Sequence, residues 1–245
     1  MSMASALWDW YAALGYDALN ALLPYAALQE AVLTALAPAP GERLFIAGCG
    51  TGNLEARALG RVDGLEIDAL DFSATMLARA RAKCAGYPSA RHHRGDLCQR
   101  LPFADAAFDA AVMCNVLYAL PDRQAARAEI SRLVRPGGRF TLCDRQPVSD
   151  PEQVTRAHFT MLRALPGRER LRGWGRTLGA LPPLLAVAAI NRRIQRRMES
   201  GAYYFYPIEE ITSLLDTLGF TVTRVEPAYA EQCWLLQARR RAEER

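Results

Sequence analysis

The chain has 245 residues, of which 51% are hydrophobic and 23% are charged, and its formal net charge is +4. This balance is typical of soluble globular proteins and excludes the disordered and fibrous classes. A chain of this length can bury most of its apolar surface without disulfides or structural metals, so we expect no metal site. The six cysteines include no C-x-x-C pair, which indicates reduced structural thiols. No basic residue precedes Arg43, so we expect a cytoplasmic protein without a secretory signal.

The elements expected along the chain begin with helices. Residues 3–36 are rich in alanine and leucine at helical spacing, and we interpret 1–38 as an N-terminal helical lid. Short apolar runs then alternate with helical segments, a pattern typical of an α/β fold with a doubly wound parallel sheet. Strands are expected at 43–47, 64–69, 91–93, 108–114, 139–144, 220–225 and 233–238, with helices at 53–59, 73–85, 121–134 and 207–218. A Pro-Gly-Gly sequence at 136–138 predicts a turn before the fifth strand.

Residues 146–202 interrupt this alternation. They are helix-rich, and residues 163–200 contain nine arginines but only two acidic residues, Glu169 and Glu199. We interpret them as an inserted helical cap on an α/β domain formed by 39–145 and 203–240. Within this segment, residues 178–198 combine an apolar first half with arginines in the second half. Two interpretations of this helix stay open: a solvated basic face, or an interfacial helix in contact with a membrane and a lipophilic substrate. Nucleic acid is not an expected partner, because the charge forms one local cluster without a recognised reading module.

A glycine loop follows the first expected strand. Gly48-Cys49-Gly50-Thr51-Gly52 leads into a helix that starts at Asn53. Glycines let a ligand approach the backbone closely, and the helix N-terminus offers free N–H groups. The spacing differs from the G-x-G-x-x-G that seats a pyrophosphate. Asp71 ends the second expected strand about 20 residues later, where an acid can accept hydrogen bonds from both ribose hydroxyls of an adenosine. Asp68 is a weaker rival, since it lies inside the strand.

Further motifs follow in order: Gly95-Asp96-Leu97, then Leu101-Pro102-Phe103, then Arg135-Pro136-Gly137-Gly138. Together with the glycine loop and Asp71, they resemble the class I S-adenosylmethionine (SAM)-dependent methyltransferases, in the group that includes ubiquinone and menaquinone methyltransferases. The resemblance covers about residues 40–145. It implies a Rossmann-like seven-stranded sheet in the order 3-2-1-4-5-7-6, SAM as cofactor, S-adenosylhomocysteine as product and a small-molecule acceptor.

The resemblance also implies a set of cofactor-binding residues. The loop glycines would face the methionine part of SAM, Asp71 the ribose and Asp96 the adenine amino group, while lid aromatics exclude water from the sulfonium. The full set is Tyr11, Tyr16, Gly48, Cys49, Gly50, Gly52, Asn53, Asp71, Phe72, Met76, Asp96, Leu97, Asn115 and Tyr118. One position departs from the family: Ile46 stands where an acid normally helps to hold the methionine ammonium. Either Asp9 or Asp17 replaces that acid, or the amino-acid end is held more loosely.

The acceptor side is less defined. The catalytic candidates are Asp144, at the end of the fifth strand, and His158, for which a structural role is the alternative. Acceptor-binding candidates are Trp174, Tyr203, Tyr204 and Tyr206. The expected function is methyl transfer to a small lipophilic or aromatic molecule, driven mainly by proximity and orientation. The alternatives are SAM-dependent transfer of another group such as aminocarboxypropyl, or a rearrangement, and a non-catalytic SAM-binding module. A nicotinamide-dependent dehydrogenase is disfavoured by the glycine spacing.

Overall fold

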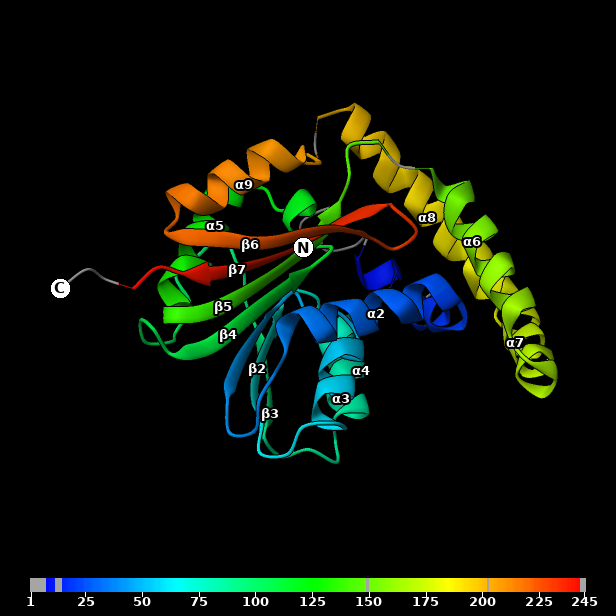
Figure 1. The fold of residues 1–245 in the computed structure, drawn as a ribbon, viewed down its shortest axis with the longest axis horizontal. Coiled ribbons are helices and arrows are strands. Elements are labelled where there is room, and N and C mark those ends of the chain that lie inside the picture. Colours follow the sequence, from blue (N-terminus) through cyan, green and yellow to red (C-terminus); the bar gives the residue numbers. More distant parts are fainter. Residues whose placement is uncertain (1–7, 12–14, 149, 202, 243–245) are drawn as a thin grey trace.

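The computed structural model describes residues 8–11, 15–148, 150–201 and 203–242. These residues form one seven-stranded sheet in the order β3-β2-β1-β4-β5-β7-β6 (Figure 1). The strands are β1 (Arg43–Ala47), β2 (Glu66–Asp71), β3 (Ala90–Arg94), β4 (Phe108–Cys114), β5 (Val134–Arg145), β6 (Phe220–Ala228) and β7 (Cys233–Arg240). Strands β1 to β5 are parallel, and β7 is antiparallel to both of its neighbours, β5 and β6. The expected doubly wound sheet and its strand order are confirmed.

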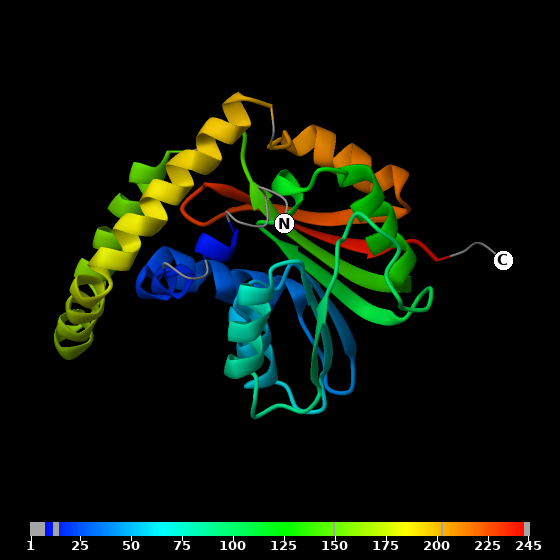
Figure 2. The ribbon, with the colours of Figure 1, turned by 180° about the vertical axis from the view of Figure 1, so that it is seen from behind.

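Helices cover both faces of the sheet, which explains why its central strands are apolar throughout. On one face lie α2 (Leu23–Leu36), α3 (Asn53–Leu59) and α4 (Ala74–Lys83); on the other lie α5 (Arg123–Leu133) and α9 (Ile208–Thr217) (Figures 1 and 2). Alternate residues of β1 serve the two cores: Ile46 packs in the first and Phe45 in the second. Ser73 caps α4 by accepting a hydrogen bond from the Met76 N–H, as expected of a serine at that position.

The predicted turn at 136–138 is wrong. Strand β5 begins earlier, at Val134, and runs through these residues with a bulge. Val134 pairs with Phe108 and Arg139 pairs with Ala110, so the extra residues between these two pairs lie on β5. Gly137 has φ 74°, a backbone conformation that glycine adopts without strain. A Cβ on Gly138 would lie 2.7 Å from Val134 Cγ1. The two glycines therefore allow the strand to bend and continue instead of ending it.

The N-terminal part of the expected lid contains a helical stretch at 8–11, the short 3₁₀ helix η1 (Tyr16–Ala21) and α2. Residues 1–7 and 12–14 of that prediction lie outside the described residues. The segment between β5 and α9 contains three helices, α6 (Pro151–Ala164), α7 (Gly167–Gly179) and α8 (Leu181–Glu199). We call these three helices the arm, since they project beyond the sheet beside α2 (Figures 1 and 2).

The arm is attached to the N-terminal helices. The Tyr11 hydroxyl donates a hydrogen bond to Asn191 Oδ1 of α8 at 3.1 Å, and Val187, Ile190 and Ile194 of α8 are buried in the same core as Tyr11. These contacts place one face of α8 against the lid and leave its other face in solvent. Among the described residues, no helix combines the length and the hydrophobicity needed to cross a lipid bilayer.

Candidate functional site

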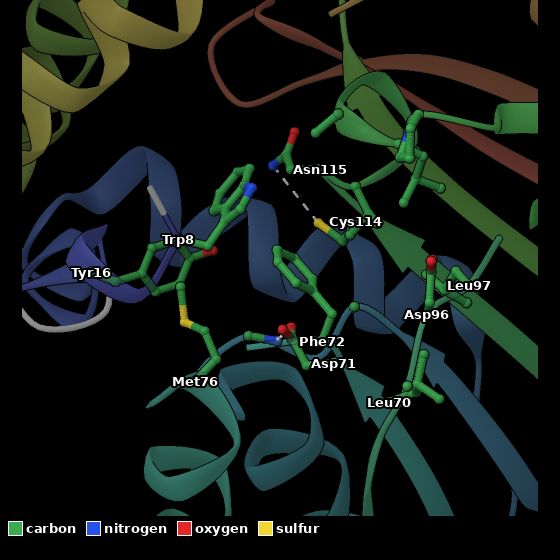
Figure 3. A pocket seen from close by; sticks show the side chains of 17 residues that line it. Trp8, Tyr16, Leu70, Asp71, Phe72, Met76, Asp96, Leu97, Cys114 and Asn115 are labelled. Atoms are coloured by element: carbon green, nitrogen blue, oxygen red, sulfur yellow. Dashed lines mark hydrogen bonds between the residues drawn. The ribbon is translucent and has the colours of Figure 1, made fainter. Parts of the chain in front are cut away.

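A cavity of about 220 Å³ lies at the carboxyl ends of β1, β2 and β4 (Figure 3). In an open α/β sheet, ligands bind at this edge. The wall has three parts: the N-terminal segment on one side, the end of β2 and the start of α4 below, and the loops after β3 and β4 opposite. It is formed by Trp8, Tyr16, Gly48, Gly50, Leu70, Asp71, Phe72, Met76, Gly95, Asp96, Leu97, Cys114, Asn115, Val116, Ala119, Leu120 and Pro121.

The glycine loop is held against β2 by its backbone. The N–H groups of Gly48 and Cys49 both donate to the Leu70 carbonyl, at 2.8 and 2.9 Å. A Cβ on Gly48, whose φ is 75°, would overlap the Val116 side chain. Gly50 also has a positive φ of 57°, and a Cβ there would meet only Tyr16 Cε1, at 3.9 Å. The loop therefore presents bare backbone to the cavity, as a site for a closely approaching ligand requires.

Asp71 lies at the point where β2 meets this loop. Its carboxylate accepts hydrogen bonds from the Gly50 N–H through Oδ2 and from the Ser73 N–H through Oδ1, both at 2.9 Å. Burial raises the pKa of the carboxyl to about 6, although these bonds oppose the shift. Each oxygen can accept a further bond, so the carboxylate fits a pair of ribose hydroxyls. Its rival Asp68 is buried in an ion-pair cluster with Arg43 and Arg91.

The predicted adenine side is also assembled. Phe72 and Met76 lie below the cavity, and Asp96 and Leu97 lie across from them (Figure 3). Asp96 accepts a hydrogen bond from the Cys98 N–H at 2.9 Å, and its side chain remains exposed. Residues predicted from sequence that do line the cavity are Tyr16, Gly48, Gly50, Asp71, Phe72, Met76, Asp96, Leu97 and Asn115.

Other predicted cofactor residues lie behind the wall. Cys49 and Asn53 line a smaller adjoining hollow under the glycine loop. Gly52 has φ 81° and precedes α3, and a Cβ there would lie 2.9 Å from Ala80 Cα, so its role is close packing of α3 on α4. Tyr11 packs edge-on against Tyr16 with ring centroids 5.0 Å apart. Tyr118 is buried on the short helix η2 (Leu117–Ala119).

Trp8 lines the cavity and was not among the predicted site residues. Its indole lies beside Tyr16 and near Asn115 in Figure 3, and its ring centroid is 5.8 Å from that of Tyr11. The spacing of Trp8 and Tyr11, three residues apart on a helix, was a signal that the two share a face. The apolar residues after β4 carried no comparable signal.

Neither catalytic candidate is in the cavity wall. His158 is buried in α6, where Nδ1 accepts from the Leu23 N–H at 3.1 Å and Nε2 lies 3.0 Å from Thr177 Oγ1. It thereby caps α2 and joins α6 to α7, and desolvation lowers its pKa. Asp144 is buried at the end of β5, where Oδ2 accepts from the Tyr118 N–H at 2.9 Å. Its Oδ1 has no partner among the described residues, and burial raises its pKa to about 7.

The predicted acceptor-binding aromatics also lie elsewhere. Trp174 packs against Phe159 within the arm. The tyrosines between the arm and α9 pack beyond η2: Tyr203 is buried against Tyr118, the Tyr206 hydroxyl accepts from Arg127, and the Tyr204 hydroxyl donates to Glu210. The structure therefore gives these residues partners outside the cavity.

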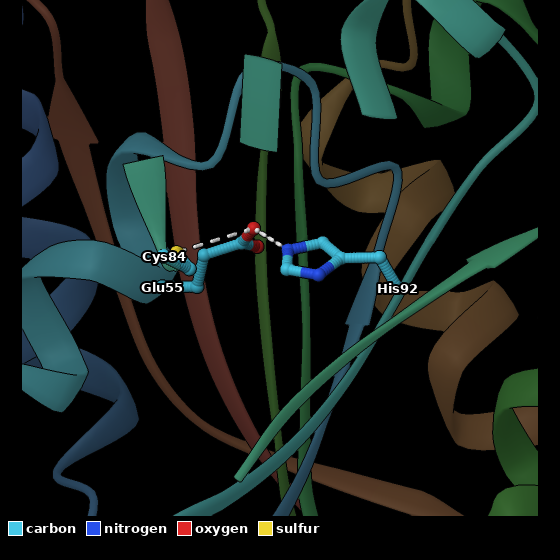
Figure 4. Close-up of side chains that lie close together, drawn as sticks. All are labelled: Glu55, Cys84 and His92. Carbon is cyan, nitrogen blue, oxygen red and sulfur yellow. Dashed lines mark hydrogen bonds and ion pairs between the residues drawn. The ribbon is translucent and has the colours of Figure 1, made fainter. Parts of the chain in front are cut away.

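A second group of titratable side chains lies behind the glycine loop: Glu55, Cys84 and His92 (Figure 4). Glu55 Oε1 lies 2.8 Å from His92 Nε2 and 3.8 Å from Cys84 Sγ. Burial, followed by the Glu55 charge, raises the pKa of the Cys84 thiol to about 12. The thiol therefore stays protonated and donates to the carboxylate, whereas a metal would need the thiolate. We interpret the group as a hydrogen-bonded brace that joins α3, α4 and β3.

Comparisons with known proteins agree with this geometry. Residues 46–142 match the family model described as "Methyltransferase domain". A demethylmenaquinone methyltransferase of Thermus thermophilus is 36% identical over 137 residues, which cover 54% of this chain and 61% of that protein. The chain spans about half the length of the curated relatives it matches.

Two solved structures show the same fold. A SAM-dependent methyltransferase from Aquifex aeolicus aligns with a TM-score of 0.58 and 16% identity, over 91% of this chain and 92% of its own. A geranyl diphosphate C-methyltransferase from Streptomyces coelicolor, solved with Mg²⁺, geranyl diphosphate and S-adenosylhomocysteine, aligns with a TM-score of 0.60 and 14% identity, over 88% of this chain and 78% of its own. Residues 46–142 thus match a methyltransferase domain, and the described residues have the fold of the SAM-dependent methyltransferases with which they align.

Proposed function

We propose that this protein transfers a methyl group from SAM to a small lipophilic molecule. The proposal is carried by the cavity at the carboxyl ends of β1, β2 and β4, where Asp71 stands beside a bare glycine loop and aromatic rings close one side. SAM has no phosphate groups, and the wall accordingly contains carboxylates and no lysine or arginine among its described residues. When bound, SAM supplies an electrophilic methyl group on a positively charged sulfur atom.

The residues of the wall have separate tasks in this proposal. Asp71 accepts the ribose hydroxyls, and Phe72 and Asp96 contact the adenine. Trp8 and Tyr16 present aromatic rings to the sulfonium. These rings attract the positive charge through cation–π interaction and exclude water from it. Burial raises the pKa of Tyr16 well above its ordinary value, so the ring stays neutral and its hydroxyl keeps its proton.

The wall also restricts the acceptor. Its ionisable side chains in the described part of the chain are Tyr16, Asp71, Asp96 and Cys114. Tyr16 is protonated at neutral pH, and the two Asp71 oxygens already accept backbone hydrogen bonds, one from Gly50 in the glycine loop and one from Ser73 at the start of α4. A phenolic acceptor such as a hydroquinone, which loses its proton far more readily than an alcohol, or a carbon nucleophile, suits such a wall better than an alcohol that needs a strong base. The names of the two relatives above, demethylmenaquinone methyltransferase and geranyl diphosphate C-methyltransferase, denote acceptors of these kinds with apolar chains.

Ile46 favours a second candidate, the transfer of the aminocarboxypropyl group, because an aliphatic side chain stands where the family places an acid near the methionine end. Mass spectrometry of reactions with SAM and either demethylmenaquinol or geranyl diphosphate separates the candidates. S-adenosylhomocysteine with a methylated acceptor supports the proposal. Methylthioadenosine supports the second candidate, and SAM binding without turnover of these acceptors or of a host extract indicates a binding module. The Asp71→Ala variant is the control for turnover at this cavity.

We further propose that the arm contacts an anionic membrane and so approaches a lipophilic acceptor. Leu171, Leu178 and Leu185 are 72%, 64% and 62% exposed. These leucines lie on α7 and α8, and the exposed arginines on the same two helices are Arg168, Arg170, Arg172, Arg176, Arg192, Arg193 and Arg196. Apolar side chains flanked by cations are the composition of helices that lie in a membrane interface.

Vesicle flotation tests this contact. The parent protein should float with vesicles containing anionic phosphatidylglycerol and not with neutral phosphatidylcholine vesicles. Replacing Arg192, Arg193 and Arg196 by glutamine should weaken binding by roughly 1 kcal/mol per charge, and replacing the three exposed leucines by serine should weaken it further. The matched control is Arg224→Gln on β6, an exposed arginine outside the arm. A parent protein that ignores anionic vesicles refutes the membrane contact and leaves the methyl-transfer proposal standing.

A further inference from the structure

A second hollow of about 40 Å³ adjoins the main cavity beneath the glycine loop. Both hollows share Tyr16, Gly48, Gly50, Cys114 and Asn115 in their walls. A buried water needs roughly 10–15 Å³ of such volume, so the hollow has room for a few heavy atoms. That is the size of a small charged group at the end of a larger ligand.

One polar atom in this second hollow lacks a partner. Gln29, on α2, is 5% exposed and lines the hollow, and its Oε1 has no hydrogen-bond partner among the described residues. Leaving a buried carbonyl oxygen without a hydrogen bond is unfavourable, because the oxygen has lost its water partners. The atom is therefore suited to accept a hydrogen bond from a group that enters the hollow.

The other acceptors around the hollow are engaged. The Tyr25 hydroxyl donates to Tyr16 Oη and receives a hydrogen bond from the Asn53 amide, at 3.3 and 3.4 Å. Asn53 Oδ1 accepts from Lys83 Nζ, and Asn115 Oδ1 accepts from the Cys233 thiol at 3.4 Å. Gln29 Oε1 differs from these acceptors because it accepts no hydrogen bond from any described residue.

Neither Asp9 nor Asp17 of the N-terminal segment takes this place. Asp17 Oδ1 accepts from the Thr51 hydroxyl at 2.6 Å and from Lys83 Nζ at 2.9 Å. Asp9 Oδ1 accepts from the Ser73 hydroxyl at 2.6 Å. Neither acid lines either hollow, and Ile46, which does line the smaller one, offers only aliphatic carbon.

We propose that the second hollow receives the amino-acid end of SAM and that Gln29 Oε1 accepts a hydrogen bond from its α-ammonium group. This inference rests on the proposed function, which places the rest of SAM in the main cavity. An ammonium carries three N–H donors and must keep them satisfied when it leaves water. A neutral amide oxygen contributes one acceptor without a counter-charge, so this chain binds the ammonium through a hydrogen bond where a carboxylate would form an ion pair.

Two ligands separate the role of Gln29 from the rest of the site. SAM and 5′-methylthioadenosine share the adenosine and the sulfur, but only SAM has the amino-acid end. By isothermal calorimetry, Gln29→Leu, which keeps the side-chain size and removes the acceptor, should weaken SAM binding at least tenfold and change methylthioadenosine binding less than twofold. Gln29→Glu should restore SAM affinity relative to the leucine variant, because it returns an acceptor and adds a counter-charge.

Thermal unfolding in parallel checks that the variants fold, and Gln29→Met replaces the leucine variant where packing fails. Equal losses for the two ligands, or an unchanged SAM affinity, would overturn the assignment of Gln29. Failure of the proposed function has a different signature: SAM binds and the Gln29 pattern is present, yet no methylated product forms.

Discussion

Asp71 offers the most direct test of the cofactor site. Its two oxygens accept from the Gly50 and Ser73 N–H groups at 2.9 Å each, and in the proposed function they also accept two ribose hydroxyls. An asparagine at this position has one carbonyl oxygen and one NH₂ group, so the NH₂ must face one of the two backbone donors. The Asp71→Asn variant therefore loses both the charge and the symmetry of the arrangement.

The size of the effect follows from these contacts. A hydrogen bond to a charged group contributes about 1.5–3 kcal/mol. With asparagine at position 71, the ribose hydroxyls lose the charged acceptor and most of this binding free energy. We expect SAM affinity to fall by at least about 2 kcal/mol, which is roughly 30-fold. Asp96→Asn is the matched control, since Asp96 is exposed and accepts one backbone bond, and it should lose only a few-fold.

The pH dependence gives a second, independent readout. Burial raises the pKa of Asp71 to about 6 in the free protein, and a protonated carboxyl accepts poorly. Wild-type SAM affinity should be constant above this pKa and fall as the pH drops below it, whereas Asp71→Asn should show little change between pH 5 and 8. Calorimetry across this range is the assay. If Asp71→Asn binds SAM within twofold of wild type at pH 7.5, the assignment of the ribose contact is refuted.

Two further predictions concern the catalytic candidates. Burial raises the pKa of Asp144 from 3.8 to about 7, so the folded state binds more protons than the unfolded one and loses stability as the pH rises between these values. Asp144→Asn should therefore stabilise the protein by about 1–3 kcal/mol at pH 8 and less at pH 5. If urea unfolding gives the same stability difference between variant and wild type at both pH values, the pKa shift is contradicted. His158→Ala should cost about 2 kcal/mol of stability through the lost helix cap with SAM affinity unchanged, while loss of turnover at full stability would instead restore its catalytic role.

Many of the residues that line the cavity could be predicted from the sequence because their signals are local. A parallel strand fixes where its last residue points, so Asp71 and the glycine loop had to meet at one edge of the sheet. The same holds for Asp96 after β3. At each of these positions, strand, loop and helix follow within a few residues, and chain connectivity leaves few alternative arrangements.

The acceptor side was less predictable because it depends on how helices pack. Tyr203, Tyr204 and Tyr206 carry the same composition signal whether they line a pocket or fill a core, and the structure gives them partners beyond η2. His158 was equally ambiguous: an apolar helical stretch suits a buried cap as well as a base. Gln29 had no signal at all, since its significance depends on α2 lying beside Ile46.

The N-terminal segment joins the cavity to the arm, and this explains its aromatic character. Tyr16 lines the cavity and packs edge-on against Tyr11, and the Tyr11 hydroxyl is bonded to Asn191 on α8. On the other side, Asp17 accepts from Thr51 of the glycine loop at 2.6 Å. Large aromatic rings with few rotatable bonds fill the space between the cavity and α8, and they exclude water from the wall that they form. In the proposed function, an acceptor that approaches along the arm would meet the same rings that would enclose the cofactor. On that proposal the N-terminal segment, more than the sheet, would distinguish one acceptor from another.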